Sequence, residues 1–207
     1  MTFAVGLFEV FTYAIPGALY LALLAYVAGR LHWLDLASLT RGPAVLVVAG
    51  VVVASYLLGY LAYPLGARFS RWLPRRRTRD VRAEFLRRNP AARGRAFVEA
   101  DSFLLFAALQ MHEPDAATEV TRTRSTGLML RSASPAMALG FVAAVVELFA
   151  GTKPWFAAGS AVLFGVLCPT MIVQHRMFAH WASLKTLELS FWAEDFDEKL
   201  ALSRDAA

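Results

Sequence analysis

Residues 43–65, PAVLVVAGVVVASYLLGYLAYPL, decide the fold class of this chain. The stretch is long, strongly apolar and free of charged side chains. A helix rises about 1.5 Å per residue, so about 20 apolar residues cross the roughly 30 Å hydrocarbon core of a bilayer. Residues 43–65 therefore predict a transmembrane helix.

Three further stretches predict additional spans. Residues 10–28 and 155–173 carry no charge, and Pro16 lies inside the first of them, where a bilayer helix tolerates proline. The remaining stretch, residues 132–150, is the third span in chain order. It is the least hydrophobic and carries Glu147 near its C-terminal end. We therefore expect an all-α, polytopic membrane protein with four transmembrane helices, a helical cytoplasmic insert and a C-terminal helix.

The overall composition supports this class. Of the 207 residues, 57% are hydrophobic and 18% are charged, more apolar and less charged than an ordinary soluble domain. Such a composition excludes intrinsic disorder, which requires low hydrophobicity and high net charge. It also argues against a disulfide-stapled scaffold, because the single cysteine, Cys168, has no partner within the chain.

Arginine is concentrated between the second and third spans. Residues 66–95 hold eleven arginines, whereas residues 29–42 and 151–154, the loops on the opposite side, hold three basic residues between them. Cytoplasmic loops of membrane proteins carry the excess of arginine and lysine. We therefore expect the arginine-rich segment and both termini to be cytoplasmic, in a membrane that is most simply a bacterial inner membrane.

The spans divide the chain into four expected parts. These are a first transmembrane hairpin (residues 1–65), a basic helical cytoplasmic insert (66–131), a second hairpin (132–173), and a cytoplasmic C-terminal helix with an acidic tail (174–207). Neither cytoplasmic segment is expected to build a stable core alone. We expect the two segments to pack on each other, on the membrane or on neighbouring subunits.

Helices are expected throughout the cytoplasmic segments. In the insert they cover residues 78–88, with Thr78 as the N-cap, 95–111, and 115–131, the last running into the third span. After the fourth span, apolar residues spaced by three or four form one helix face. These residues are Trp181, Leu184, Leu187 and Phe191.

Motifs for catalysis or metal binding are missing from the sequence. His112 and Glu113 begin like a zinc-protease motif, but the run HEPDA lacks the second histidine, and Pro114 breaks the helix. There is no nucleophile elbow and no phosphate-binding P-loop. We therefore expect no enzyme, cofactor or metal. An unrecognised lipid-modifying enzyme using Glu9, His175 and His180 is a remaining alternative.

The third span combines a stripe of small residues with an acidic residue. Small residues recur every four positions, at Ser132, Ala136, Gly140 and Ala144, a spacing that lets membrane helices approach closely. The stripe indicates either bundle packing within one chain or an interface between subunits. Glu147 either reaches the headgroups or lines a water-filled path that favours cations.

The arginine run has two interpretations. It sets the topology and attracts anionic lipid, or it binds a phosphate-rich ligand such as a nucleotide or oligonucleotide, because arginine forks bind phosphate through two hydrogen bonds. We expect no binding to duplex DNA. The candidate anion-binding residues are Arg75, Arg76, Arg77, Arg79 and Arg82.

Several features together resemble a family of bacterial membrane proteins. They are an IPG turn in the first span (residues 15–17), a YLLGYL stretch in the second (residues 56–61), and the basic helical insert. With four spans and both ends inside, the chain is similar to small four-span effectors of nucleotide-signalling anti-phage defence. The resemblance implies a protein that opens a pore or disrupts the membrane when a nucleotide signal changes.

Two functions from different classes are therefore expected. The first is an oligomeric membrane effector that forms a pore or disrupts the inner membrane and is gated by an anionic cytoplasmic signal. Its partners would be the lipid bilayer, further copies of the chain and a nucleotide ligand. The second is a non-enzymatic membrane anchor or assembly factor that docks a cytoplasmic partner on the helical insert.

Overall fold

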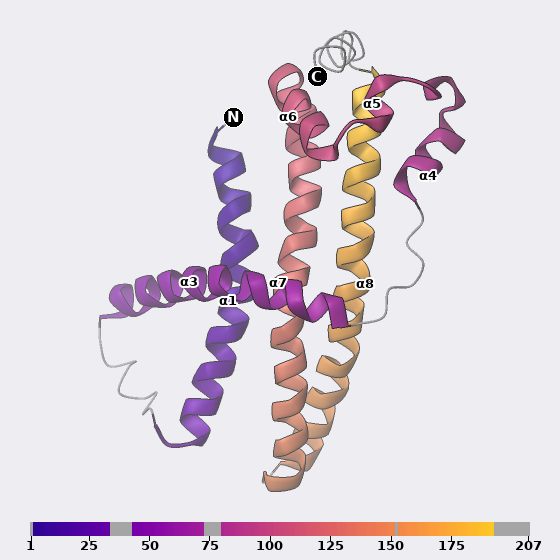
Figure 1. Ribbon diagram of the computed structural model, residues 1–207. Helices are drawn as coiled ribbons and strands as arrows, with labels where there is room; N and C mark the ends of the chain where they lie inside the picture. Colours follow the sequence, from indigo (N-terminus) through magenta and orange to yellow (C-terminus); the bar gives the residue numbers. More distant parts are fainter. Residues whose placement is uncertain (1, 34–42, 73–79, 152, 193–207) are drawn as a thin grey trace. The chain divides into compact units, whose positions relative to one another are not determined.

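The computed structural model describes residues 2–33, 43–72, 80–151 and 153–192, with side chains from residue 10 onward. Within these ranges the chain is helical and contains no strand, which confirms the all-α class. Four helices are long and apolar enough to cross a membrane, so the chain is a multi-pass membrane protein by the length and composition of its helices. They are α1 (Thr2–Arg30), α3 (Ala44–Trp72), α7 (Pro114–Ala150) and α8 (Pro154–Trp192) (Figure 1).

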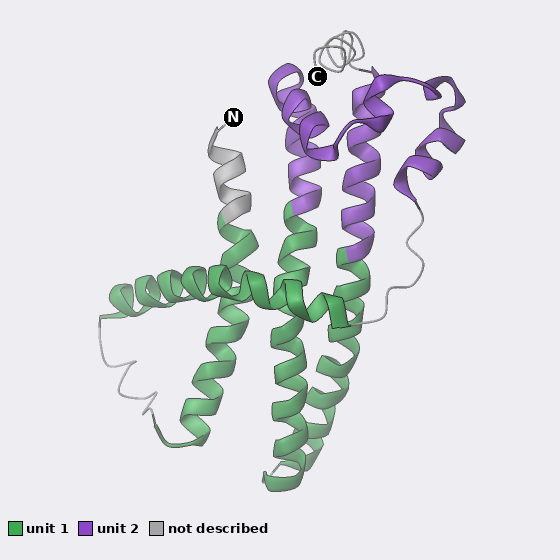
Figure 2. Ribbon diagram, in the orientation of Figure 1, with its two compact units in different colours: residues 1–74, 125–175 green, residues 75–124, 176–207 purple. Residues whose placement is uncertain are grey.

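The chain divides into two compact units, shown in Figure 2. Unit 1 comprises Met1–Pro74 and Ser125–His175, and unit 2 comprises Arg75–Arg124 and Arg176–Ala207. Two of the boundaries between the units fall inside helices. The boundary after Arg124 lies in α7 and the boundary after His175 lies in α8, so each of these helices continues from one unit into the other. The insert and the C-terminal helix therefore supply one unit together.

In unit 1, α1 and α3 approach each other through glycine. A methyl group built on Gly17 would overlap the carbonyl oxygen of Ser55, and one built on Gly59 would overlap the carbonyl oxygen of Tyr13. Tyr13 packs beside this contact against Tyr56 and other tyrosine rings of α3, with centroids 6.0 Å apart for the Tyr13–Tyr56 pair. Only glycine at both positions permits backbones this close, as is common between membrane helices.

Helix α3 also contacts α7, again through a glycine. A methyl group on Gly66 would lie 2.6 Å from the carbonyl oxygen of Arg131. Figure 1 shows α3 running across α1 and α7 rather than alongside them, so its first half packs on neither helix. The valine-rich residues 44–53 are accordingly almost all exposed. In a bilayer this exposure costs little, because lipid tails are as apolar as valine.

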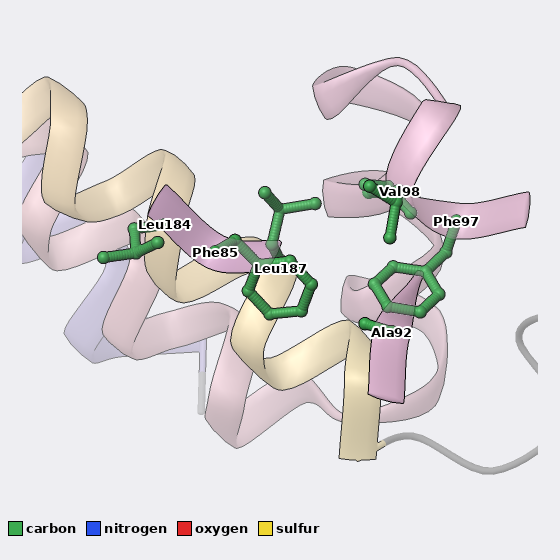
Figure 3. Packing of buried hydrophobic residues seen from close by; sticks show 7 residues of the cluster. Phe85, Ala92, Phe97, Val98, Leu184 and Leu187 are labelled. Carbon is green, nitrogen blue, oxygen red and sulfur yellow. The ribbon is translucent and has the colours of Figure 1, made fainter. Parts of the chain in front are cut away.

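Unit 2 is built from short helices packed on the ends of α7 and α8. They are α4 (Val81–Arg88), the 3₁₀ turn η1 (Pro90–Ala92), α5 (Ala96–Glu99) and α6 (Ser102–His112). Phe85 of α4 and Phe97 of α5 are fully buried against Leu184 and Leu187 of α8 (Figure 3). Phe191 packs at the edge of the same cluster. Of the four residues expected on the apolar face of the tail helix, only Trp181 is exposed.

Capping aspartates mark where two helices begin. The carboxylate of Asp80 accepts the Arg82 amide at 3.0 Å and caps α4, which begins at Val81, whereas Thr78, the expected N-cap, lies outside the described residues. The helix expected over residues 95–111 is broken into α5 and α6. The break occurs because Asp101 is extended and its carboxylate accepts the Phe103 amide, which starts a new helix.

Candidate functional site

Unit 1 contains a cavity of about 300 Å³ between α1, α7 and α8. Its α7 wall is made mostly of small residues, because Ala136, Gly140, Ala143 and Ala144 leave space that larger side chains would fill. Most of the remaining wall is apolar and bulky, and its polar side chains are Tyr26, Glu147 and Ser160. It is formed mainly by Leu19 and Leu23 of α1, Met137 of α7, and Phe156 and Phe164 of α8.

One end of the cavity is polar. Glu147 lies there and accepts hydrogen bonds from the Tyr26 hydroxyl at 2.9 Å and from Nε of Arg30 at 3.1 Å. Arg30 also donates from Nη2 to the carbonyl oxygen of Ala150, the last residue of α7. The Arg30 side chain remains 50% exposed, and that of Glu147 remains 26% exposed. We call Tyr26, Arg30 and Glu147 the polar triad.

The structure brings four candidate residues of the sequence analysis together. Ala136, Gly140, Ala144 and Glu147 all line this cavity. The small-residue stripe, including Ser132, is buried inside a single chain. This burial favours bundle packing over a subunit interface for the stripe. Glu147 is held by Tyr26 and Arg30 at the end of the spans, so it does not project alone into the cavity.

Of the five arginine candidates, only Arg82 lies within the described residues. Arg75, Arg76, Arg77 and Arg79 lie outside the described residues. Arg82 is described, and its Nη2 donates to the carbonyl oxygens of Glu99 and Ala100, both at 3.3 Å. These bonds hold the N-terminal end of α4 against the end of α5. Arg82 therefore has a structural role in unit 2, whatever the other arginines bind.

A second polar cluster lies in unit 2 around a buried carboxylate. Glu84 is 9% exposed and contacts Arg88 at 2.6 Å and Nε2 of His180 at 3.1 Å. Arg88 also reaches Glu188 of α8 at 3.4 Å. Burial raises the pKa of the Glu84 carboxyl, but the hydrogen bonds and charges of His180 and Arg88 outweigh it, so the pKa is lowered. The cluster ties α4 to α8.

The two polar clusters differ in their surroundings. The polar triad can hold a charged group at the end of an apolar cavity, whereas the Glu84 cluster closes on itself. Among the described residues, no group of three or more histidine, cysteine, aspartate or glutamate side chains is arranged to hold a metal ion.

Sequence reasoning missed the partners of both carboxylates. Tyr26 and Arg30 are four residues apart and share a helix face, so the pair was readable as one polar site at the end of the first span. No local signal pairs Glu84 with His180, since 96 residues separate them. Comparisons of the chain with protein-family models, with curated proteins and with solved structures found no match.

Proposed function

We propose that this protein is an oligomeric membrane effector that permeabilises the membrane when unit 2 binds an anionic ligand. The observation that supports it best is the continuity of α7 and α8 between the two units. Each helix has 37 or 39 residues, about 55 Å or more, whereas a span needs only about 30 Å. A rearrangement of unit 2 would therefore reach the spans through two helices that both units share.

Charge favours an anionic ligand and a cytoplasmic unit 2. The segment that leads into α4 carries Arg75, Arg76, Arg77 and Arg79, and the excess of arginine here follows the positive-inside rule. Arginine clusters recognise phosphate groups through paired hydrogen bonds. We assign ligand binding to these four arginines and to the guanidinium donors of Arg82 that its bonds to Glu99 and Ala100 leave over.

Permeation requires several copies of the chain. The cavity of unit 1 is lined almost entirely by apolar side chains, and an apolar cavity of this kind stays dry. Four packed helices likewise leave no wide lumen. A conducting path would therefore form between copies, with the exposed apolar face of α3 available to meet a neighbour or lipid.

Dye release from vesicles tests this function. The full chain would be reconstituted into phosphatidylethanolamine–phosphatidylglycerol vesicles loaded with carboxyfluorescein and exposed to a panel of cyclic di- and trinucleotides. We expect at least one nucleotide to accelerate release, and the triple variant Arg75→Gln, Arg76→Gln, Arg77→Gln to remove that response. The control Arg122→Gln, outside the run, retains it. The proposal would be contradicted if the vesicles retain the dye with every nucleotide and the protein is monomeric in mild detergent.

A second function is favoured by one surface of unit 2. Helix α6 buries Leu105 and Leu109 but exposes Phe103, Leu104 and Met111, the last at 84%. An exposed apolar helix face of this kind suits a protein partner. Under this alternative the chain is an anchor that docks a cytoplasmic protein. The double variant Phe103→Ser, Met111→Ser would then release the partner from membranes while leaving vesicles as tight as before.

A further inference from the structure

We infer that the unit 1 cavity is a binding site for a membrane phospholipid, with one acyl chain between α1, α7 and α8 and the phosphate at Arg30. This inference is independent of pore formation and concerns a different part of the chain from the arginine run.

The shape and lining of the cavity fit an acyl chain. A volume of about 300 Å³ lies at the lower end of the range for ligand pockets and is far larger than a packing defect. Its wall is largely apolar along three helices, with Ser160 as a polar exception on α8, and Tyr26 and Glu147 lie in the last turns of α1 and α7. Within a bilayer, the neighbouring molecules that are long, flexible and apolar are lipid tails.

The polar triad supplies charge complementarity for a headgroup. The Arg30 guanidinium uses Nε for Glu147 and Nη2 for Ala150, and half of its side-chain surface is exposed. A guanidinium carries five donors, so this one has further donors to offer a phosphate oxygen. The triad lies at the last turns of α1 and α7, where those spans end. Headgroup phosphates occupy this depth of a membrane.

The small residues of α7 leave the space that the lipid tail would occupy. Gly140 cannot be enlarged freely, because a methyl group there would lie 3.3 Å from the Phe164 ring. Ala144, by contrast, faces the cavity, and a larger side chain at this position would occupy the space assigned to the lipid tail. Val146 is on the same helix but is exposed and does not line the cavity, so it provides a matched control.

Photo-crosslinking in vesicles tests the site directly. The full chain would be reconstituted in phosphatidylethanolamine–phosphatidylglycerol vesicles containing a trace of phosphatidylglycerol with a diazirine in one acyl chain. After illumination, crosslinked peptides are mapped by mass spectrometry. We expect crosslinks concentrated at residues 136–144 and 156–164, above those on the exposed valines of residues 44–53. An even distribution over lipid-exposed surfaces would overturn the inference without any variant.

Substitutions then separate the tail from the headgroup. Ala144→Leu should reduce the cavity crosslinks at least about tenfold, equivalent to ~1.4 kcal/mol, whereas Val146→Leu leaves them unchanged. Arg30→Gln should reduce them about fivefold, and Lys153→Gln, at the same end of the spans, leaves them unchanged. Circular dichroism of each variant in detergent verifies that it is folded.

Two further outcomes would overturn the inference. If Ala144→Leu leaves the crosslinks unchanged, the tail does not occupy the cavity. If a diazirine fatty acid without phosphate labels the cavity as efficiently as the phospholipid, and Arg30→Gln has no effect on either probe, the occupant is a free fatty acid. The phospholipid assignment would then be wrong.

Discussion

Helices in unit 1 meet through glycine and backbone, whereas helices in unit 2 meet through phenylalanine and leucine. Gly17, Gly59 and Gly66 admit neighbouring backbones in unit 1. In unit 2, Phe85 and Phe97 fill the space between helices. We attribute the difference to the solvent that each unit is predicted to face. Lipid tails are as apolar as the side chains and do not drive them into a core, so close van der Waals contact determines how helices pack. Water, in contrast, drives large apolar side chains into a core.

The treatment of charge differs in the same way. Unit 1 places its ion pair, Arg30–Glu147, at the end of the spans with both side chains partly exposed. Unit 2 buries Glu84 and surrounds it with Arg88 and His180. A charge inside the membrane is expensive, so it lies at the edge. In unit 2 a buried carboxylate is tolerated because cations satisfy it.

The largest effect is expected where backbones touch. Gly59→Leu would place a side chain on the carbonyl of Tyr13, and neither backbone can yield without separating α1 from α3. We expect little or no folded protein by size-exclusion chromatography in detergent. Gly50→Leu is the matched control on the same helix, because a methyl group there meets nothing within 4 Å. Equal yields from the two variants would remove the contrast between the units.

A smaller but still large loss is expected in the core of unit 2. Phe85→Ala should lower the free energy of unfolding by about 3–5 kcal/mol, the usual cost of a large cavity in a core. Phe103 is 74% exposed, and its ring centroid lies 6.0 Å from the Arg124 guanidinium, so Phe103→Ala should cost about 1 kcal/mol or less. Denaturant unfolding followed by hydrogen exchange in α4 measures both. Similar costs for the two would show that unit 2 lacks the core described here.

The buried carboxylate should make unit 2 sensitive to acid. Because the pKa of Glu84 is lowered on folding, its ionised form stabilises the folded state. This contribution is present above the ordinary carboxyl pKa and is lost as the pH falls through the lowered folded-state pKa. We expect Glu84→Gln to have a lower Tm than wild type at pH 7, and the gap to close in acid.

Melting curves of the wild type and Glu84→Gln between pH 7 and about pH 3 measure this gap. Glu113→Gln, a change at an exposed position, should leave the Tm at pH 7 unchanged. A gap that stays constant as the pH falls would show that the loss comes from altered packing rather than from charge.

The smallest effect is expected at the edge of unit 1. Glu147→Gln should change the free energy of unfolding by about 1 kcal/mol or less, because partly exposed ion pairs contribute little. Unfolding in a detergent titration, beside Glu84→Gln at neutral pH, measures the comparison. A loss as large as that of Phe85→Ala would mean that Glu147 is buried deeper than its exposure indicates.

The spans could be predicted from sequence because hydropathy and length alone determine them. Residues 43–65 and 155–173 needed no knowledge of the fold. All of the first stretch except Pro43 lies in α3, and the second lies within α8. The break near Asp101 was missed, because apolar residues on both sides concealed a capping residue. An Asp-Ser pair before an apolar run is nevertheless a readable signal for a helix start.

The site could be predicted only in part. Spacing identified Ala136, Gly140 and Ala144 as a close-packing face, but a stripe does not say which helix it meets. Its partners, α1 and α8, follow from the fold. The pairing of Glu84 with His180 joins segments about a hundred residues apart, and no pattern within either segment anticipates it.

Unit 2 is formed by two segments that are far apart in the sequence, and this has a consequence for its synthesis. Its aromatic side chains at Phe85 and Phe97 are made before the third span, but Leu184 and Leu187, which cover them, follow the fourth. At about 5–20 residues per second, ribosomes take roughly 4–17 s to bridge that interval. During these seconds the apolar side chains of Phe85 and Phe97 stay uncovered in the nascent chain. Chaperone capture during this window is expected to limit how much protein a cell accumulates.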